Sequence, residues 1–235
     1  MITTTTGITP IQSSNYANSP DPHAWRDAAN GIIYAENIKN ALVEIDNENK
    51  AFYEANFEKY KKELEAVDQK IKDLIQSVPE DKRVLITSHD AFQYYGRKYG
   101  IRLESILGTS TDAEAQTSDI NRLIKTIRES KVPAIFIEST INPQTMKQIA
   151  KDTKIKIGAK LHADSLGEPD SPSGTYTGML VTNTENIVSG LLGQSSIEEG
   201  TGNGENGGKG NTFFFIIFGV LLLGGAFFMF RKMNG

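Results

Sequence analysis

Short apolar runs alternate with segments of helical periodicity in the central part of the chain. Residues 84–86, VLI, form an apolar run of strand length, and the polar pair His89-Asp90 follows it closely. The aromatic and small apolar residues that come next recur at roughly helical spacing until Gly100, which is typical of a helix end. The pattern therefore predicts a buried strand, a short loop and a helix over residues 83–100.

The same alternation continues toward the C-terminus. It predicts further strands at 102–108, 134–137 and 155–161, and helices at 118–129, from Asn142 onward and at 176–192. Strands that alternate with helices favour an α/β fold with a doubly wound parallel sheet of about four strands. His89, Glu138 and Asp164 each follow one of these strands. Because the carboxyl ends of parallel strands meet at one edge, we expect the three side chains to converge there.

Two long helices are predicted before this sheet. Apolar residues follow a helical period from Ala28 to about Asp46 and again from Ala51 to about Val78, and Pro79 ends the second helix. Glu and Lys fill the other positions of the second helix, which is typical of a solvated face with i,i+4 charge pairs. The pattern thus places a pair of long helices ahead of the α/β lobe.

The C-terminal region has a different composition. Residues 193–211 are rich in Gly, Glu, Asn and Ser, which indicates a flexible linker. Residues 213–230 are apolar throughout apart from glycine, and at about 1.5 Å per residue a helix of this length spans roughly 27 Å, near the thickness of a bilayer core. Arg231 and Lys232 follow it, so we expect a transmembrane helix with a cytoplasmic C-terminus and an extracytoplasmic globular part.

Residues 1–10 have neither the basic nor the apolar region of a secretory signal. An exported globular part without an export signal is a contradiction. We therefore expect the sequence to be the later part of a longer precursor, or to have a misassigned start.

Composition narrows the chemistry further. The 235-residue chain has no cysteine, which excludes disulfides and thiolate metal sites, and its net charge of −4 gives no general attraction to nucleic acid. It has three histidines, so a site for a first-row metal must combine His nitrogen with Asp or Glu oxygen.

Two histidines and one aspartate are the candidate metal ligands. His23 lies in the segment DPHAW, where Pro22 stiffens the approach and Trp25 can pack beside the imidazole. Together with His89 and Asp164 it offers two imidazoles and one carboxylate, a set that suits Zn(II), Mn(II) or Fe(II). The three residues are far apart in sequence, so this hypothesis depends on the fold. The alternative is that each histidine is an ordinary loop residue without a ligand.

Several motifs occur in one order over about residues 7–192, namely DPHAW, NGIIYAENI, VLITSHDAFQYYGRKYG, VPAIFIEST and LHADSLG. In this the chain resembles the metal-binding receptors of bacterial ABC importers for manganese, zinc or iron, the cluster A-I or TroA-like solute-binding proteins. The resemblance implies two α/β lobes joined by one long rigid helix, here beginning near Ala28, with metal bound between the lobes.

The resemblance also implies roles for particular residues. The histidine of DPHAW, His23, the residue after the central strand, His89, and the aspartate of the last motif, Asp164, are implied metal ligands. Glu138 matches an acidic position near the site that is not a ligand, and His162 has no ligand role. The implied function is an extracytoplasmic receptor, not an enzyme, that delivers zinc or manganese to an ABC permease.

The sequence departs from the family pattern at its start. The first lobe of the family lies before DPHAW and supplies the first metal histidine, whereas only some twenty residues precede that motif here. We therefore expect most of this lobe, and one ligand, to be missing. The expected division is a remnant of the first lobe with DPHAW (1–27), the linking helix and a second helix (28–78), the C-terminal α/β lobe (79–192), the Gly-rich linker (193–211) and the transmembrane helix (212–232).

Two other functions remain open at this point. A membrane-tethered interaction or adhesion module could retain the lobe as a scaffold with weakened or lost metal binding. A zinc enzyme would also use three ligands and a water, but only Asp90 or Glu138 could serve as its general base. The metal is also open, because His89 in place of Glu favours zinc, while NGIIYAENI is similar to the manganese-type receptors.

Overall fold

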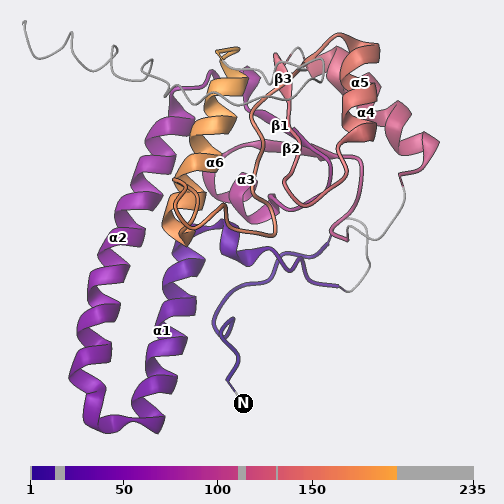
Figure 1. Cartoon of the computed structure of the whole chain (residues 1–235). Helices are drawn as coiled ribbons and strands as arrows, with labels where there is room; N and C mark the ends of the chain where they lie inside the picture. The colour runs from indigo at the N-terminus through magenta and orange to yellow at the C-terminus, as the bar shows by residue number, and fades with distance from the viewer. Residues whose placement is uncertain (1, 14–18, 111–114, 131, 195–235) are drawn as a thin grey trace, which may run out of the picture. The chain divides into compact units, whose positions relative to one another are not determined.

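The computed structural model describes residues 2–13, 19–110, 115–130 and 132–194. The chain forms two compact units, residues 1–197 and 198–235, and every residue described here belongs to the first. That unit begins with a segment that has a turn at residues 4–7 and with a 3-10 turn, η1 (Ala24–Arg26), followed by a helical hairpin and an α/β region (Figure 1).

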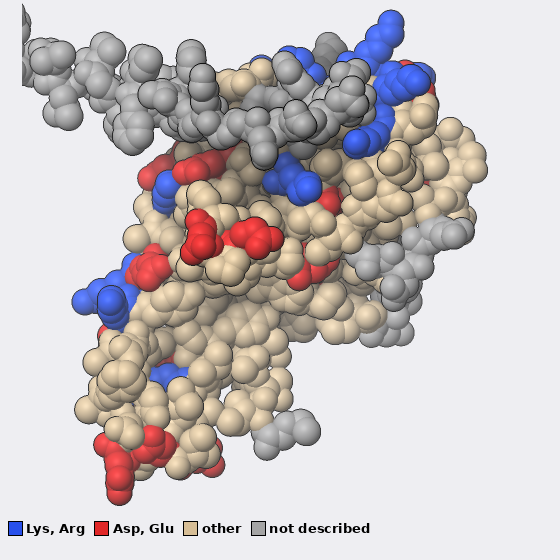
Figure 2. Space-filling model, viewed as in Figure 1, with Lys and Arg blue, Asp and Glu red and all other residues tan. Residues whose placement is uncertain are grey.

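The hairpin consists of α1 (Ala28–Ile45) and α2 (Lys50–Gln76), joined by the 3-10 turn η2 (Asn47–Asn49). The Asp27 side chain caps α1 by accepting a hydrogen bond from the amide of Ala29. The buried residues of α2 recur at helical spacing and face the α/β region: Leu64, Val67, Ile71 and Ile75. The hairpin tip is acidic on the face drawn in Figure 2, and it also exposes Ile45 and Phe52.

Four short parallel strands form the centre of the α/β region. After the 3-10 turn η3 (Glu80–Lys82), β1 (Val84–Thr87) pairs with β2 (Arg102–Ser105), and β3 (Ala134–Ile135) pairs with β4 (Lys156–Ile157). The amide of Phe136 donates to the carbonyl of Ile86 at 2.8 Å, so β3 lies beside β1. The strands therefore follow the spatial order β2-β1-β3-β4.

Helices cover both faces of these strands (Figure 1). Leu85 belongs to an apolar cluster with α2, α3 (Gln93–Tyr99) and α6 (Tyr176–Leu191), whereas Ile86 belongs to a second cluster with α4 (Thr117–Ser130) and α5 (Gln144–Thr153). Neighbouring residues of one strand face opposite sides, so both faces of β1 are apolar and buried. The expected α/β fold with parallel strands is confirmed.

The strands are shorter than the apolar runs predicted. Of the expected 155–161, only β4 is regular, and pairing with the β3 segment resumes at an isolated bridge between Glu138 and Leu161. The register shows why: Ile135 pairs with Ile157, 22 residues on, whereas Glu138 pairs with Leu161, 23 residues on. One extra residue on the later segment interrupts the ladder as a bulge does and changes which side the following residues face.

The predicted transmembrane segment, 213–230, and residues 195–211 of the predicted linker lie outside the described residues. Among the helices that the structure does describe, none combines the length and the apolar character needed to cross a bilayer.

We predict that Gly31→Ala destabilises the packing of α1 against α6. A Cβ atom at Gly31 would lie 2.8 Å from the ring of Tyr176, whose hydroxyl donates to the carbonyl of Trp25. Overpacking of this kind costs about 1–3 kcal/mol, measurable by urea unfolding. Asn40→Ala, at an exposed position of the same helix, is the matched control and should change stability by less than about 0.5 kcal/mol. Equal stability of the two variants would contradict this packing.

Candidate metal centre

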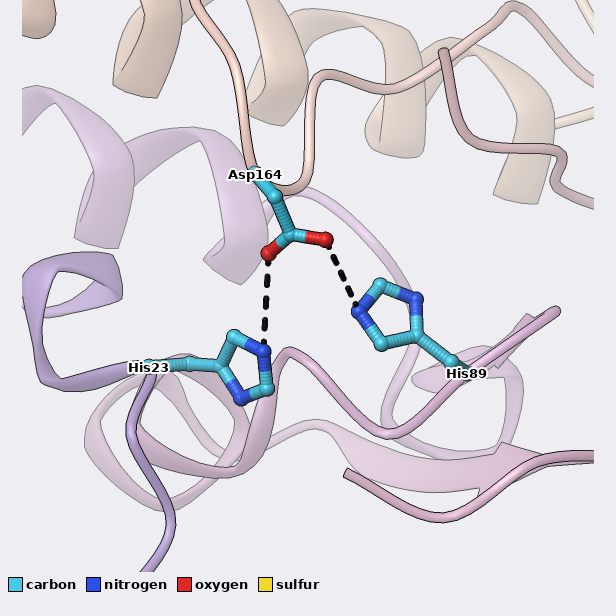
Figure 3. Close-up of side chains that lie close together, drawn as sticks. All are labelled: His23, His89 and Asp164. Atoms are coloured by element: carbon cyan, nitrogen blue, oxygen red, sulfur yellow. Dashed lines mark ion pairs between the residues drawn. The ribbon is translucent and has the colours of Figure 1, made fainter. Parts of the chain in front are cut away.

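The structure brings together the three residues proposed as metal ligands. His23 directly precedes η1, His89 follows β1, and Asp164 follows the bulged segment after β4 (Figure 3). One ligand atom of each side chain lies within 4.8 Å of the others. Asp164 is central: its Oδ1 lies 3.5 Å from Nε2 of His23, and its Oδ2 lies 3.2 Å from Nε2 of His89.

His23 is held by the aspartate two residues before it. Oδ1 of Asp21 accepts hydrogen bonds from the backbone amide and from Nδ1 of His23, both at 2.8 Å. The Trp25 ring packs edge-on against the imidazole, with ring centres 5.3 Å apart, as the sequence suggested. Because Nδ1 is engaged, Nε2 is the nitrogen that faces the site.

His89 is held in the same way by Glu138, which is fully buried with it. Oε1 of Glu138 accepts from the backbone amide and from Nδ1 of His89, at 3.2 and 3.0 Å, while Oε2 accepts from the amide of Ser88 at 3.0 Å. Nε2 of His89 is buried, and its 3.2 Å approach to Asp164 lacks hydrogen-bond geometry. A buried nitrogen with this environment is suited to binding a metal ion.

The spacing of the ligand atoms fits metal coordination. Zinc bonds of about 2.0–2.1 Å in tetrahedral geometry separate neighbouring ligand atoms by about 3.3 Å. The two observed nitrogen–oxygen separations, 3.2 and 3.5 Å, are of this size and end on different oxygens of Asp164, while one ligand atom of each residue lies within 4.8 Å of the others. Metal-bound histidines commonly donate their second N–H to a carboxylate, which fixes ring orientation and raises basicity, and Asp21 and Glu138 provide that partner here.

The carboxylates also shift the pKa values of the site. Burial by itself would lower the pKa of His89, but its interactions with Asp164 and Glu138 outweigh burial and raise the pKa to about 9. For His23, Asp164 and Asp21 likewise outweigh burial and raise the pKa. Burial would raise the pKa of Asp164, but the two histidines hold it well below its usual range. The three side chains therefore stabilise one another's charged forms.

The remaining residues singled out in the sequence lie around this cluster. Glu138 is beside the site, as expected, and His162 is not among the three clustered ligands; its Nε2 lies 3.0 Å from Oγ of Ser173. Asp21 was not predicted from the sequence as the partner of His23, although an aspartate two residues before a fixed side chain is an Asx-turn signal. Arg26, a buried cation that donates to the carbonyl of His162, was not predicted either.

The first 190 residues match a family model described as "Zinc-uptake complex component A periplasmic". The chain therefore belongs to this family of metal-binding components of ABC transporters, as the motifs indicated.

Curated relatives agree with this assignment. The chain is 38% identical over 181 residues to the metal ABC transporter substrate-binding lipoprotein FimA of Streptococcus parasanguinis, covering 77% of this chain and 59% of FimA. It is 36% identical to the manganese ABC transporter substrate-binding lipoprotein PsaA of Streptococcus pneumoniae, covering 77% of this chain and 58% of PsaA. The chain thus spans somewhat more than half the length of these relatives, which are named as substrate-binding lipoproteins.

Solved structures share the fold. The periplasmic zinc-binding protein TroA of Treponema pallidum superposes with a TM-score of 0.73 at 30% identity, over 77% of this chain and 67% of TroA. A manganese-bound periplasmic metal-binding protein from Candidatus Liberibacter asiaticus gives a TM-score of 0.73 at 34% identity, over 81% of this chain and 70% of its own.

We predict that the cluster stabilises the metal-free chain most between about pH 4 and pH 6.5. Because the pKa of Asp164 is lowered in the folded chain, its carboxylate stabilises the fold at pH values above 3.8, its pKa in the unfolded chain. This stabilisation is lost in acid. Because the pKa of His89 is raised in the folded chain, its imidazolium stabilises the fold fully below pH 6.5, its pKa in the unfolded chain. This stabilisation is lost as the pH rises through about 9.

The measurement is the difference in urea-unfolding free energy between the wild type and Asp164→Asn in the presence of a chelator. It should be largest near pH 5 and should shrink by about pH 9.5. A difference independent of pH would contradict the charged cluster.

Proposed function

We propose that this chain binds zinc or manganese as cargo, as the receptor component of an ABC importer. The observation that supports this most directly is the convergence of His23, His89 and Asp164, with each imidazole oriented by a carboxylate of its own. Such an arrangement presents two imidazole nitrogens and one carboxylate oxygen to a cation.

The exposure of the three side chains favours an exchangeable ion over a permanent structural one. His89 is fully buried and His23 nearly so, while the Asp164 side chain keeps 31% of its surface exposed. Asp164 is therefore the ligand on the solvent side, where an ion would enter and leave. Three protein ligands also leave at least one coordination position for a further group, whereas a structural zinc site is normally closed by four.

The identity of the metal is best treated as a choice between two ions. Two imidazoles favour zinc, while the carboxylate and any water ligands suit manganese. Among the relatives, PsaA is named for manganese and TroA for zinc. We propose that the chain takes up one of these two ions, and direct competition between them will assign it.

We also propose the cellular setting. The chain divides into the helices of 28–78, a metal-binding lobe at 79–192 and an apolar segment at 212–232. This division fits a membrane-tethered receptor whose globular part is extracytoplasmic. Its partner would be the permease of the importer. The FimA and PsaA relatives are named as lipoproteins of ABC transporters, which supports a position at the outer surface of the membrane.

We predict that His89→Ala and Asp164→Asn each weaken binding of Zn(II) and Mn(II) by at least about 100-fold. Each change removes one of three protein ligands. Removal of a group that only hydrogen-bonds to a ligand typically lowers metal affinity about 10–100-fold, and removal of the ligand itself should lower it more. The measurement is competitive titration of the full chain against a metal chelator, with circular dichroism to establish folding.

Asp170→Asn is the matched control, because Asp170 is an exposed aspartate in the loop that follows Asp164. Its affinity should equal that of the wild type. Unchanged affinity in either ligand variant would refute the site. A wild type that binds neither ion would favour the interaction or adhesion module instead.

We predict that metal affinity increases with pH up to about 9. His89 must release its Nε2 proton before it can bind a cation, and its raised pKa of about 9 leaves it protonated at neutral pH. The apparent dissociation constant should therefore fall at least about tenfold per pH unit between about pH 6.5 and pH 8.5. Titrations at three pH values measure the slope, and a flat profile would exclude His89 as a ligand.

A further inference from the structure

Arg26 is a buried cation three residues after His23. Only 1% of its surface is exposed. Its guanidinium lies 4.6 Å from the centre of the Phe92 ring, donates to Sδ of Met179 at 3.2 Å, and donates to the carbonyl of His162. These contacts connect the segments that contain the three proposed ligands. Arg26 itself follows His23, Phe92 follows His89, and His162 precedes Asp164.

None of these contacts neutralises the charge. Within the part of the chain that the structure describes, no carboxylate lies within ion-pair distance of Arg26, and its Nε has no hydrogen-bond partner. Burial lowers its pKa only to about 10, so the guanidinium stays charged at neutral pH. Burying an unpaired charge is expensive, and the carboxylates that attract Arg26 from a distance are Asp164 and Glu138 of the metal centre.

Arg26 therefore enters the charge balance of the site. The two imidazoles lie against the acidic side chains of Asp21, Glu138 and Asp164. Arg26 adds one fixed positive charge to these acidic surroundings, which weakens their attraction for a bound cation.

We propose that Arg26 is a specificity-determining residue whose fixed positive charge adapts the metal centre to divalent over trivalent cations. This inference rests on the proposed metal-binding function. Because the electrostatic energy of an ion scales with its charge, Arg26 repels a trivalent ion more than a divalent one at the same position. Discrimination of this kind would keep ferric and similar ions out of a receptor for divalent cargo.

The test compares Arg26→Gln, which removes the charge, with Arg26→Lys, which retains it. Arg26→Met is a second neutral variant that keeps an unbranched apolar stem against Phe92. Each full-length variant and the wild type are titrated with Mn(II) and with Lu(III), two ions of similar radius, at one pH. The quantity measured is the ratio of the Lu(III) to the Mn(II) association constant.

We expect this ratio to rise roughly tenfold in the neutral variants, and to stay within about threefold of the wild type in Arg26→Lys. A purely structural role would lower both association constants together and leave the ratio unchanged, which would overturn the inference while leaving the metal site intact. Absence of Mn(II) and Zn(II) binding in the wild type would overturn the proposed function, and this inference with it.

Discussion

The buried carboxylate of Glu138 is the interaction on which the geometry of the site depends. It follows β3 and accepts hydrogen bonds from the backbone of Ser88 and His89, which follow β1, and from the His89 imidazole. One side chain thus joins the ends of two neighbouring strands and fixes one ring. A carboxylate without these donors would be costly to bury, so the strand ends and the histidine are constrained together.

The parallel strands explain why the remaining groups meet at the same place. β1 and β3 lie side by side, and the segment after β4 pairs with Glu138 at Leu161, so three strand ends open at one edge. The one-residue bulge before Leu161 sets the side to which the chain toward Asp164 turns. His23 reaches this edge from outside the sheet, on a turn fixed by Asp21.

The site is also a balance of buried charges. The two imidazoles lie against three carboxylates, two of which attract the buried Arg26 from a distance. The pKa values of His89 and Asp164 shift in opposite directions because each stabilises the charged form of the other. A divalent cation that displaces protons from the imidazoles replaces one set of positive charges with another. Proton and metal therefore compete for the same nitrogen atoms. The fixed positive charge of Arg26 opposes the binding of either cation.

The sequence by itself determined the alternation of strands and helices, the family and the three candidate ligands. Periodicity and strand length are local properties, and motifs such as DPHAW are contiguous, so they can be read without a fold. Strand ends could not be placed from apolar runs, because the bulge after β4 depends on pairing between segments some twenty residues apart. Only the tertiary structure decided that Asp21 and Glu138 orient the histidines and that Arg26 is buried with no ion pair to any residue that the structure describes. These are relations between side chains distant in sequence, and they arise from packing and burial, which the sequence pattern does not contain.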